Sequence, residues 1–112
     1  MTNQYYQEKI KRTMNNKLTS IERISMLCMG IAGESGEMID YLKKAYFHDH
    51  TLSFDILKNE IGDILWYLGN ICNEYNFDLS EIMQLNIDKL KKRYPAGFDT
   101  EKSRNRDNAI SE

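Results

Sequence analysis

The sequence predicts an all-α protein, a four-helix bundle built from one small domain. Two long segments carry apolar residues three and four positions apart, which is the period of a helix that buries one face. Residues that favour helix starts precede both segments. The 112 residues also include one proline and six glycines, which leaves few turn signals for a many-stranded fold.

The first two predicted helices differ in the strength of their pattern. A polar segment from about Thr2 to Asn15 is the weaker of the two. A longer helix begins at Thr19 and continues to about His48. Its start has the capping-box pattern, in which the side chains of Thr19 and Glu22 each satisfy a free backbone amide. The stripe along this helix comprises Ile21, Ile24, Cys28, Ile31, Ser35, Met38 and Leu42.

The third and fourth predicted helices each follow a capping residue. Ser53 caps the third helix, whose apolar stripe is typical of a bundle seam and not of a β-strand. The fourth opens with Asp78 and Glu81 and ends before Pro95 and Gly97, which together stop a helix and turn the chain. The stripe of the third helix comprises Leu57, Ile61, Ile64, Leu68, Ile71 and Tyr75.

The apolar pattern ends at Asp99. From there to Glu112 the chain has four acids, three bases and a single isoleucine. Such a segment has no apolar face to dock. We therefore expect one helical domain over residues 1–98 and a charged, disordered tail over residues 99–112.

Composition and charge exclude several classes of protein. The net charge is 15 − 17 = −2, which lacks the basic excess of a protein that binds a nucleic acid polymer. No apolar segment is long enough to cross a membrane, and the N-terminus lacks the apolar core of a signal peptide. Cys28 and Cys72 are too few for a disulfide framework or a four-cysteine zinc site. We expect a cytoplasmic protein with neither a nucleic acid nor a membrane partner.

The second helix also predicts self-association. Between Ile24 and Gly33 only Ser25 is polar, and a helix that is apolar all round needs neighbours all round. The other helices of so small a chain cover it poorly, so we expect a homodimer or tetramer. Trp66 lies about 180° from the centre of the third stripe. This position suits a dimer contact or a surface that stacks on a ligand, and an exposed tryptophan is the remaining alternative.

Four carboxylates on the second and third helices carry the chemistry. Glu34 and Glu37 are three residues apart, as are Glu60 and Asp63, so each pair shares a helix face. In an antiparallel hairpin the two pairs can converge, and converging carboxylates repel unless a cation lies between them. Mg²⁺ or Mn²⁺ prefers such oxygen ligands, and two such ions could hold a phosphate and activate a water. The alternative is four ordinary surface acids.

Glycines accompany these acids. Gly33, Gly36 and Gly62 each cost a helix interior roughly 1 kcal/mol against alanine. Close packing or the approach of a ligand would compensate for that cost.

Other metal and phosphate chemistries do not fit. Ferritin-like di-iron bundles use Glu-x-x-His, but acids stand three residues after Glu34, Glu37 and Glu60. His48 and His50 lie in the loop between the second and third helices, where a polar loop is the simpler interpretation. We interpret the cysteines as buried small hydrophobes. The phosphate-binding Gly-x-x-x-x-Gly-Lys-Ser/Thr pattern is absent.

A polar strip runs along the fourth helix. Asn86, Lys89 and Arg93 step by three and four beside its apolar face. One interpretation is a solvated basic stripe. The other is a phosphate clamp, in which an amide, an ammonium and a guanidinium reach a polyphosphate.

Three motifs follow one another between about residues 25 and 98. They are Gly33-Glu-Ser-Gly-Glu-Met38, Glu60-Ile-Gly-Asp-Ile-Leu-Trp-Tyr-Leu68 and Asn86-x-x-Lys-Leu-x-x-Arg-Tyr-Pro-x-Gly-Phe98. Together they resemble the MazG-like all-α nucleoside triphosphate pyrophosphohydrolases. The resemblance implies a helical bundle, usually a dimer or higher assembly, that holds Mg²⁺ by Glu-x-x-Glu and Glu-x-x-Asp. It also implies hydrolysis of a nucleoside or deoxynucleoside triphosphate to the monophosphate and pyrophosphate.

The resemblance also assigns roles by position. The metal ligands would be Glu34, Glu37, Glu60 and Asp63, and Glu34 or Glu37 could act on the attacking water as the catalytic carboxylate. The substrate contacts would be Asn86, Lys89, Arg93 and Tyr94, with Trp66 as a stacking surface. Many members have a further glutamate where this chain has Gly33. The alternative function is therefore a catalytically weak helical protein that binds a nucleotide or a partner and regulates it.

Overall fold

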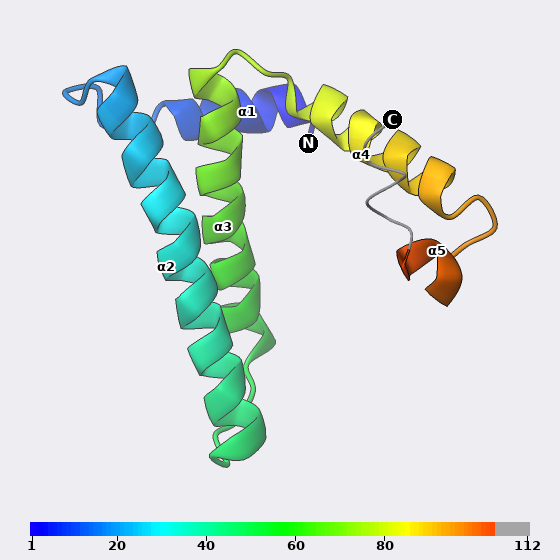
Figure 1. The fold of residues 1–112 in the computed structure, drawn as a ribbon. Coiled ribbons are helices and arrows are strands. Elements are labelled where there is room, and N and C mark those ends of the chain that lie inside the picture. The colour runs from blue at the N-terminus through cyan, green and yellow to red at the C-terminus, as the bar shows by residue number, and fades with distance from the viewer. Residues whose placement is uncertain (105–112) are drawn as a thin grey trace. The chain divides into compact units, whose positions relative to one another are not determined.

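The computed structural model describes residues 1–104, and these residues are mostly helical (Figure 1). The helices are α1 (Asn3–Lys11), α2 (Ser20–Phe47), α3 (Phe54–Glu74), α4 (Leu79–Arg93) and α5 (Thr100–Arg104). No β-strand occurs among these residues. The all-α prediction is confirmed, and α1 to α4 are the four predicted helices.

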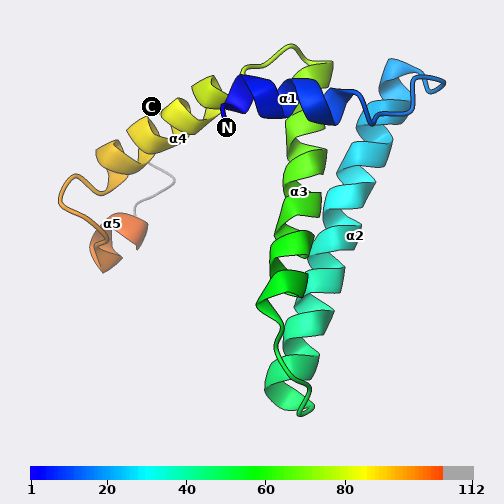
Figure 2. The ribbon, with the colours of Figure 1, turned by 180° about the vertical axis from the view of Figure 1, so that it is seen from behind.

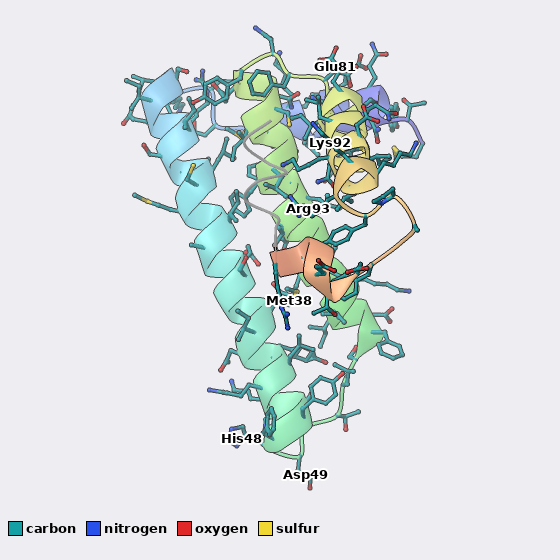
Figure 3. The ribbon with its side chains drawn as sticks, turned by 45° about the vertical axis from the view of Figure 1, so that its right-hand side comes forward. Met38, His48, Asp49, Glu81, Lys92 and Arg93 are labelled. Atoms are coloured by element: carbon teal, nitrogen blue, oxygen red, sulfur yellow. The ribbon has the colours of Figure 1, made fainter. Side chains whose placement is uncertain are left out.

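The chain divides into two compact units. The first, Met1–Phe77, contains α1, α2 and α3, and the second begins at Asp78 with α4. In the first unit α2 and α3 run antiparallel as a long hairpin. The helix α1 packs across α3 near the C-terminal end of α3 (Figures 1 and 2). The loop of residues 48–53 closes the hairpin, with His48 and Asp49 at its tip (Figure 3).

The predicted helix starts are confirmed. Thr19 and Glu22 form a reciprocal capping box, with hydrogen bonds between each side chain and the backbone amide of the other. The side chains of Ser53 and Asp78 cap α3 and α4 in the same manner, since each accepts a hydrogen bond from an amide of the first turn. The three boundaries follow from short polar side chains that satisfy free amides.

The first helix ends earlier than predicted, at Lys11 instead of about Asn15. The amides of Thr13 and Met14 bond to carbonyls three residues back, which tightens the helix end into a turn. The Thr13 hydroxyl also donates to the Ile10 carbonyl at 2.6 Å. Thr13 thereby supplies hydrogen-bond donors to a backbone carbonyl at the C-terminal end of α1.

The first unit buries only part of its apolar surface. Ile10, Leu27 and Cys72 are its buried hydrophobic side chains. The predicted stripe of α3 is only partly covered, since Ile61 and Leu68 are more than 40% exposed. The contacts instead fall on both sides of this stripe: Tyr67 contacts Gly30 of α2, and Gly69 contacts Ile10 of α1.

The cysteine prediction holds for one residue of the two. Cys72 is buried on α3, whereas Cys28 is exposed on α2. The neighbour Leu27 takes the inward position, and one residue along a helix turns the side chain by about 100°. Cys28 is therefore outside the core of the first unit, and so is Met29, which is 74% exposed.

A short helix, α5, occupies Thr100–Arg104 within the segment expected to be disordered. The Asp99 side chain accepts a hydrogen bond from the Glu101 amide at this helix start. The rest of the expected tail, residues 105–112, lies outside the described residues. None of the helices described is long and apolar enough to cross a membrane.

Candidate metal centre

Three of the four predicted acids converge between α2 and α3. One carboxylate oxygen from each of Glu34, Glu37 and Glu60 lies within 4.8 Å of the other two. Glu34 and Glu60 are half-buried, whereas Glu37 is exposed, so the cluster is open to solvent. The fourth acid, Asp63, is close enough for its charge to act on Glu34. We call Glu34, Glu37, Glu60 and Asp63 the acid cluster.

The hairpin loop helps to set the register of the two helices. The Tyr41 hydroxyl, on α2, accepts a hydrogen bond from the Ser53 amide at 2.5 Å. The same hydroxyl lies 3.5 Å from the carbonyl oxygen of Thr51. One side chain of α2 therefore anchors the residue that caps α3. Measured along the hairpin from this loop, the acids of α2 and those of α3 therefore lie at similar distances.

A glycine allows α2 and α3 to approach closely beside the acid cluster. A Cβ placed on Gly30 would lie 2.1 Å from Cε1 of the Tyr67 ring. Gly30 is about one helical turn before Glu34, and Tyr67 is about one turn after Asp63. The ring of Tyr67 fills the space that any larger residue at position 30 would need. The sequence analysis did not predict this contact, because neither Gly30 nor Tyr67 belongs to a predicted apolar stripe.

The environment of Glu34 raises the pKa of its carboxyl group to about 7. The largest cause is a hydrogen bond to Glu60, followed by loss of solvent around the group. The negative charges of Glu37, Glu60 and Asp63 raise the pKa further. A carboxylate pair of this kind holds a proton where a cation would otherwise balance the charge.

Two oxygens of the acid cluster have unmet bonding capacity. Glu34 Oε2 and Glu60 Oε2 are enclosed and accept no hydrogen bond from the described residues. Enclosed carboxylate oxygens without a donor are costly to bury. They are also the ligands that hard divalent cations prefer. The donor set, all oxygen and strongly negative, therefore fits Mg²⁺ or Mn²⁺.

Among residues 1–104, no ion pair involves a carboxylate of the acid cluster. The ion pairs of α2 involve other carboxylates: Arg23 pairs with Glu74, and Asp40 contacts Lys43 and Lys44. The hydrogen bond from Lys44 is the largest cause of the lowered pKa of Asp40. Two carboxylates of one helix thus have pKa values shifted in opposite directions. The difference arises because Asp40 contacts cations and Glu34 contacts other acids.

The glycines beside the acids are not needed for close packing within the first unit. A Cβ on Gly33, Gly36 or Gly62 would meet no atom within 4 Å among the described residues. Of the two compensations expected for these glycines, close packing is therefore not found within the first unit. The approach of a ligand remains a prediction.

Trp66 stands beside the acid cluster on α3. Its indole N–H donates to the Thr13 hydroxyl at 2.7 Å. Its ring meets that of Tyr67 edge to face, with centroids 5.0 Å apart. Both aromatic residues line a shallow hollow together with Glu34 and Asp63. A flat side chain is thus held in a defined orientation next to two carboxylates.

The residues predicted to contact substrate from the fourth helix belong to the second unit. Asn86 and Lys89 are exposed on α4, and Tyr94 caps its C-terminus. Arg93 is buried, its Nε has no hydrogen-bond partner among the described residues, and its guanidinium lies 5.8 Å from the Tyr94 ring centroid. Figure 3 shows Lys92 and Arg93 near the end of α4. Contact between these residues and the acid cluster stays a prediction, because they belong to a different unit from α2 and α3.

These features define a class of protein. It is an all-α protein in which two antiparallel helices gather carboxylates into a group suited to a divalent cation. The model of the MazG nucleotide pyrophosphohydrolase domain matches residues 23–98, and the chain belongs to this family. The match covers most of α2 and all of α3 and α4, with the acid cluster and the polar strip of α4.

A viral protein is among the relatives. The Gene 37 protein of Mycobacterium phage L5 is 34% identical to this chain over 82 residues, which cover 70% of this chain and 72% of that protein. No solved structure matches the chain.

Proposed function

We propose that this protein hydrolyses a nucleoside or deoxynucleoside triphosphate to the monophosphate and pyrophosphate, with Mg²⁺ or Mn²⁺ as cofactor. The observation that carries the proposal is the convergence of Glu34, Glu37 and Glu60 within 4.8 Å. It occurs in a chain of the MazG nucleotide pyrophosphohydrolase family. Membership supports this class of reaction, and the acid cluster supplies the side chains that the reaction needs.

The acid cluster would hold the metal. Glu34, Glu37, Glu60 and Asp63 are the proposed ligands, and the enclosed oxygens of Glu34 and Glu60 are the best candidates for direct bonds. A bound divalent ion would neutralise phosphate charge and lower the pKa of a coordinated water. The shared proton of the Glu34–Glu60 pair would leave on loading, because metal ligands must be deprotonated.

The attacking water needs a base, and we assign this role to Glu34 or Glu37. The water oxygen forms a bond to the α-phosphorus, and the bond from that phosphorus to the bridging oxygen of the β-phosphate breaks. The carboxylate orients the water and accepts its proton, while the electron pair of the broken bond stays on the pyrophosphate. Glu37 is the more exposed of the two, which favours access to solvent water.

The remaining residues would bind the substrate. Lys89 and Arg93 balance the charge that develops on the leaving pyrophosphate, as fixed cations do in phosphoryl transfer. Asn86 and Tyr94 add polar contacts to the same phosphates. Trp66, held beside Glu34 and Asp63, offers a ring on which the base could stack. We also propose a cytoplasmic location, which suits free nucleotides as substrates and agrees with the two free cysteines.

The test is pyrophosphate release from a panel of nucleoside and deoxynucleoside triphosphates with Mg²⁺, with Mn²⁺ and with excess EDTA. We expect turnover that requires the metal and is abolished in Glu37→Gln and Glu60→Gln. The matched control is Asp40→Asn, which removes a carboxylate of α2 that pairs with lysines instead of acids. Full turnover in EDTA would contradict the metal assignment.

The second candidate function, a catalytically weak regulator that binds a nucleotide or a partner, is favoured by Gly33. The resemblance to the MazG-like family implies a glutamate at this position in many members, and here no side chain occupies the open space at position 33. Metal-dependent nucleotide binding without pyrophosphate release from any member of the panel would support this candidate over the enzyme.

A further inference from the structure

A second polar cavity lies in the first unit. It has a volume of about 260 Å³ and is formed by the C-terminal end of α1, the loop between α1 and α2, the first turn of α2 and the C-terminal part of α3. None of its residues was assigned to the acid cluster or to the substrate contacts. The polar side chains of its wall are Lys11, Asn16, Arg23, Asn70, Asn73 and Glu74.

A chain of amide hydrogen bonds fixes how two of these side chains are oriented. Gln7 Nε2 donates to the backbone carbonyl of Phe77 at 2.9 Å, and that carbonyl can only accept. The same nitrogen donates to Asn73 Oδ1 at 3.1 Å, so this atom of Asn73 must be the oxygen. Asn73 Nδ2 then donates to the backbone carbonyl of Gln7 and to the side-chain oxygen Oδ1 of Asn70.

The result is that Asn70 presents a donor with no acceptor. Its side chain is 1% exposed, and its Nδ2 has no hydrogen-bond partner within the part of the chain that the structure describes. Exchanging the oxygen and nitrogen of the Asn70 amide would place its nitrogen against the Nδ2 donor of Asn73. The exchange would therefore leave a donor without an acceptor again. A buried amide donor left in this state is costly unless an acceptor reaches it from the cavity.

The charges around the cavity favour an anion. Among the described residues, Glu74 is the only carboxylate of the cavity wall. Both oxygens of Glu74 are engaged, by Arg23 Nε and by the Ser20 hydroxyl. Lys11 forms no ion pair among residues 1–104. The cavity therefore has one cation in excess in addition to the buried donor of Asn70.

We propose that this cavity binds a small molecule through an oxyanion group, which Lys11 and Asn70 recognise together. An oxyanion accepts several hydrogen bonds at once, and its negative charge would pair with the ammonium group of Lys11. The volume is slightly below the usual range for drug-sized ligands, about 300–1,000 Å³, so the ligand is small. A phosphate ester and a carboxylate share this chemistry. The site is independent of the proposed hydrolysis.

The test is a titration of the full-length protein, followed through the side-chain amide signal of Asn70 in ¹⁵N-labelled samples. Excess EDTA is present throughout, because the metal-free acid cluster repels anions and cannot account for their binding. Sodium phosphate, sodium acetate and sodium chloride are compared at equal ionic strength. We expect a saturable shift of the Asn70 signal with phosphate or acetate, and the stronger of the two identifies the source of the oxyanion.

Two lysines of α1 make a matched pair for this experiment. Lys11→Gln removes the cation of the cavity wall and should weaken binding by about three- to tenfold, the range for one partly exposed charged contact. Lys9→Gln makes the same change on the same helix, but Lys9 lies over the ring of Tyr5 and not on the cavity wall. Equal effects of the two changes would overturn the proposal. So would an Asn70 signal that responds to chloride as it does to phosphate and acetate.

Discussion

The carboxyl groups of Glu34 on α2 and Glu60 on α3 have oxygens within 4.8 Å of each other, and hydrogen bonding between these groups is the largest cause of the raised pKa of Glu34. A carboxylate cannot donate a hydrogen bond, so one member of the pair must hold a proton when the bond exists. The proton thus takes the place of a positive charge in the acid cluster. Because the proton and a metal ion compete for the same oxygens, the state of this pair should depend on pH and on divalent ions.

Stability of the metal-free protein should fall as the pH rises through 7. The pKa of Glu34 is about 7 in the folded protein against an ordinary value of 4.5, so the folded state binds the proton more tightly than the unfolded state. The resulting stabilisation is fully present below a pH of about 4.5 and is lost as the pH rises through about 7. Thermal unfolding followed by circular dichroism in EDTA measures this, with Glu34→Gln as the reference. Parallel pH profiles for the two proteins would show that the pair has no such coupling.

Two glycines of α2 should respond oppositely to the same substitution. Gly30→Ala would force a Cβ into the Tyr67 ring, and such overpacking costs about 1–3 kcal/mol. Gly33→Ala meets no atom within 4 Å and should stabilise the helix by up to about 1 kcal/mol. Urea unfolding of both variants decides the matter. A destabilised Gly33→Ala would mean that position 33 is packed against something outside the first unit.

Changes at Arg93 and Trp66 should separate phosphate binding from base selection. Arg93→Lys keeps the charge but loses the planar two-pronged contact, so kcat/KM should fall about ten- to a hundredfold for every nucleotide, with the base order unchanged. Trp66→Ala removes the ring beside Glu34 and Asp63 and should change the order of base preference. Trp66→Phe is its control, because it keeps an aromatic face and loses only the hydrogen bond to Thr13. A reordering caused by Arg93→Lys and not by Trp66→Ala would reverse the two assignments.

The protein should sediment as a dimer or a larger assembly at micromolar concentration. The apolar side chains of α2 that the first unit leaves uncovered include Met29, which is 74% exposed, and Ile21, which is 78% exposed. Met29→Lys would place a charge on this surface and should shift the population toward monomer, whereas Lys43→Gln, at an exposed polar position, should not. A wild-type species of 13.2 kDa would exclude self-association under these conditions.

The sequence predicted the helices well because their starts depend on local chemistry. Thr19, Ser53 and Asp78 cap amides within their own first turns, so no distant contact is needed to locate the helix starts. The end of α1 was predicted four residues too late, because it depends on the turn that Thr13 forms. The face of α3 that is buried was also missed in part. It depends on which neighbours α1 and α2 supply, and periodicity gives no information about those neighbours.

The acid cluster was predictable for a geometric reason. The i, i+3 spacing places each pair on one helix face, and a short loop makes the helices antiparallel, so the convergence of Glu34, Glu37 and Glu60 follows from two local rules. The fit of Gly30 against Tyr67 and the buried amide of Asn70 depend on the distance between helices. That distance is set by packing, which a single sequence does not display.

The α2–α3 hairpin has a consequence for how the protein folds. All four acids come from one pair of helices joined by a short loop, and the contacts that align them are close in sequence. Structures of low contact order form quickly, because little loop entropy is lost before the contacts are gained. The acid cluster can therefore assemble as soon as this hairpin closes, without waiting for α4. A divalent ion that binds the nascent hairpin would then guide folding, in addition to any part it takes in chemistry.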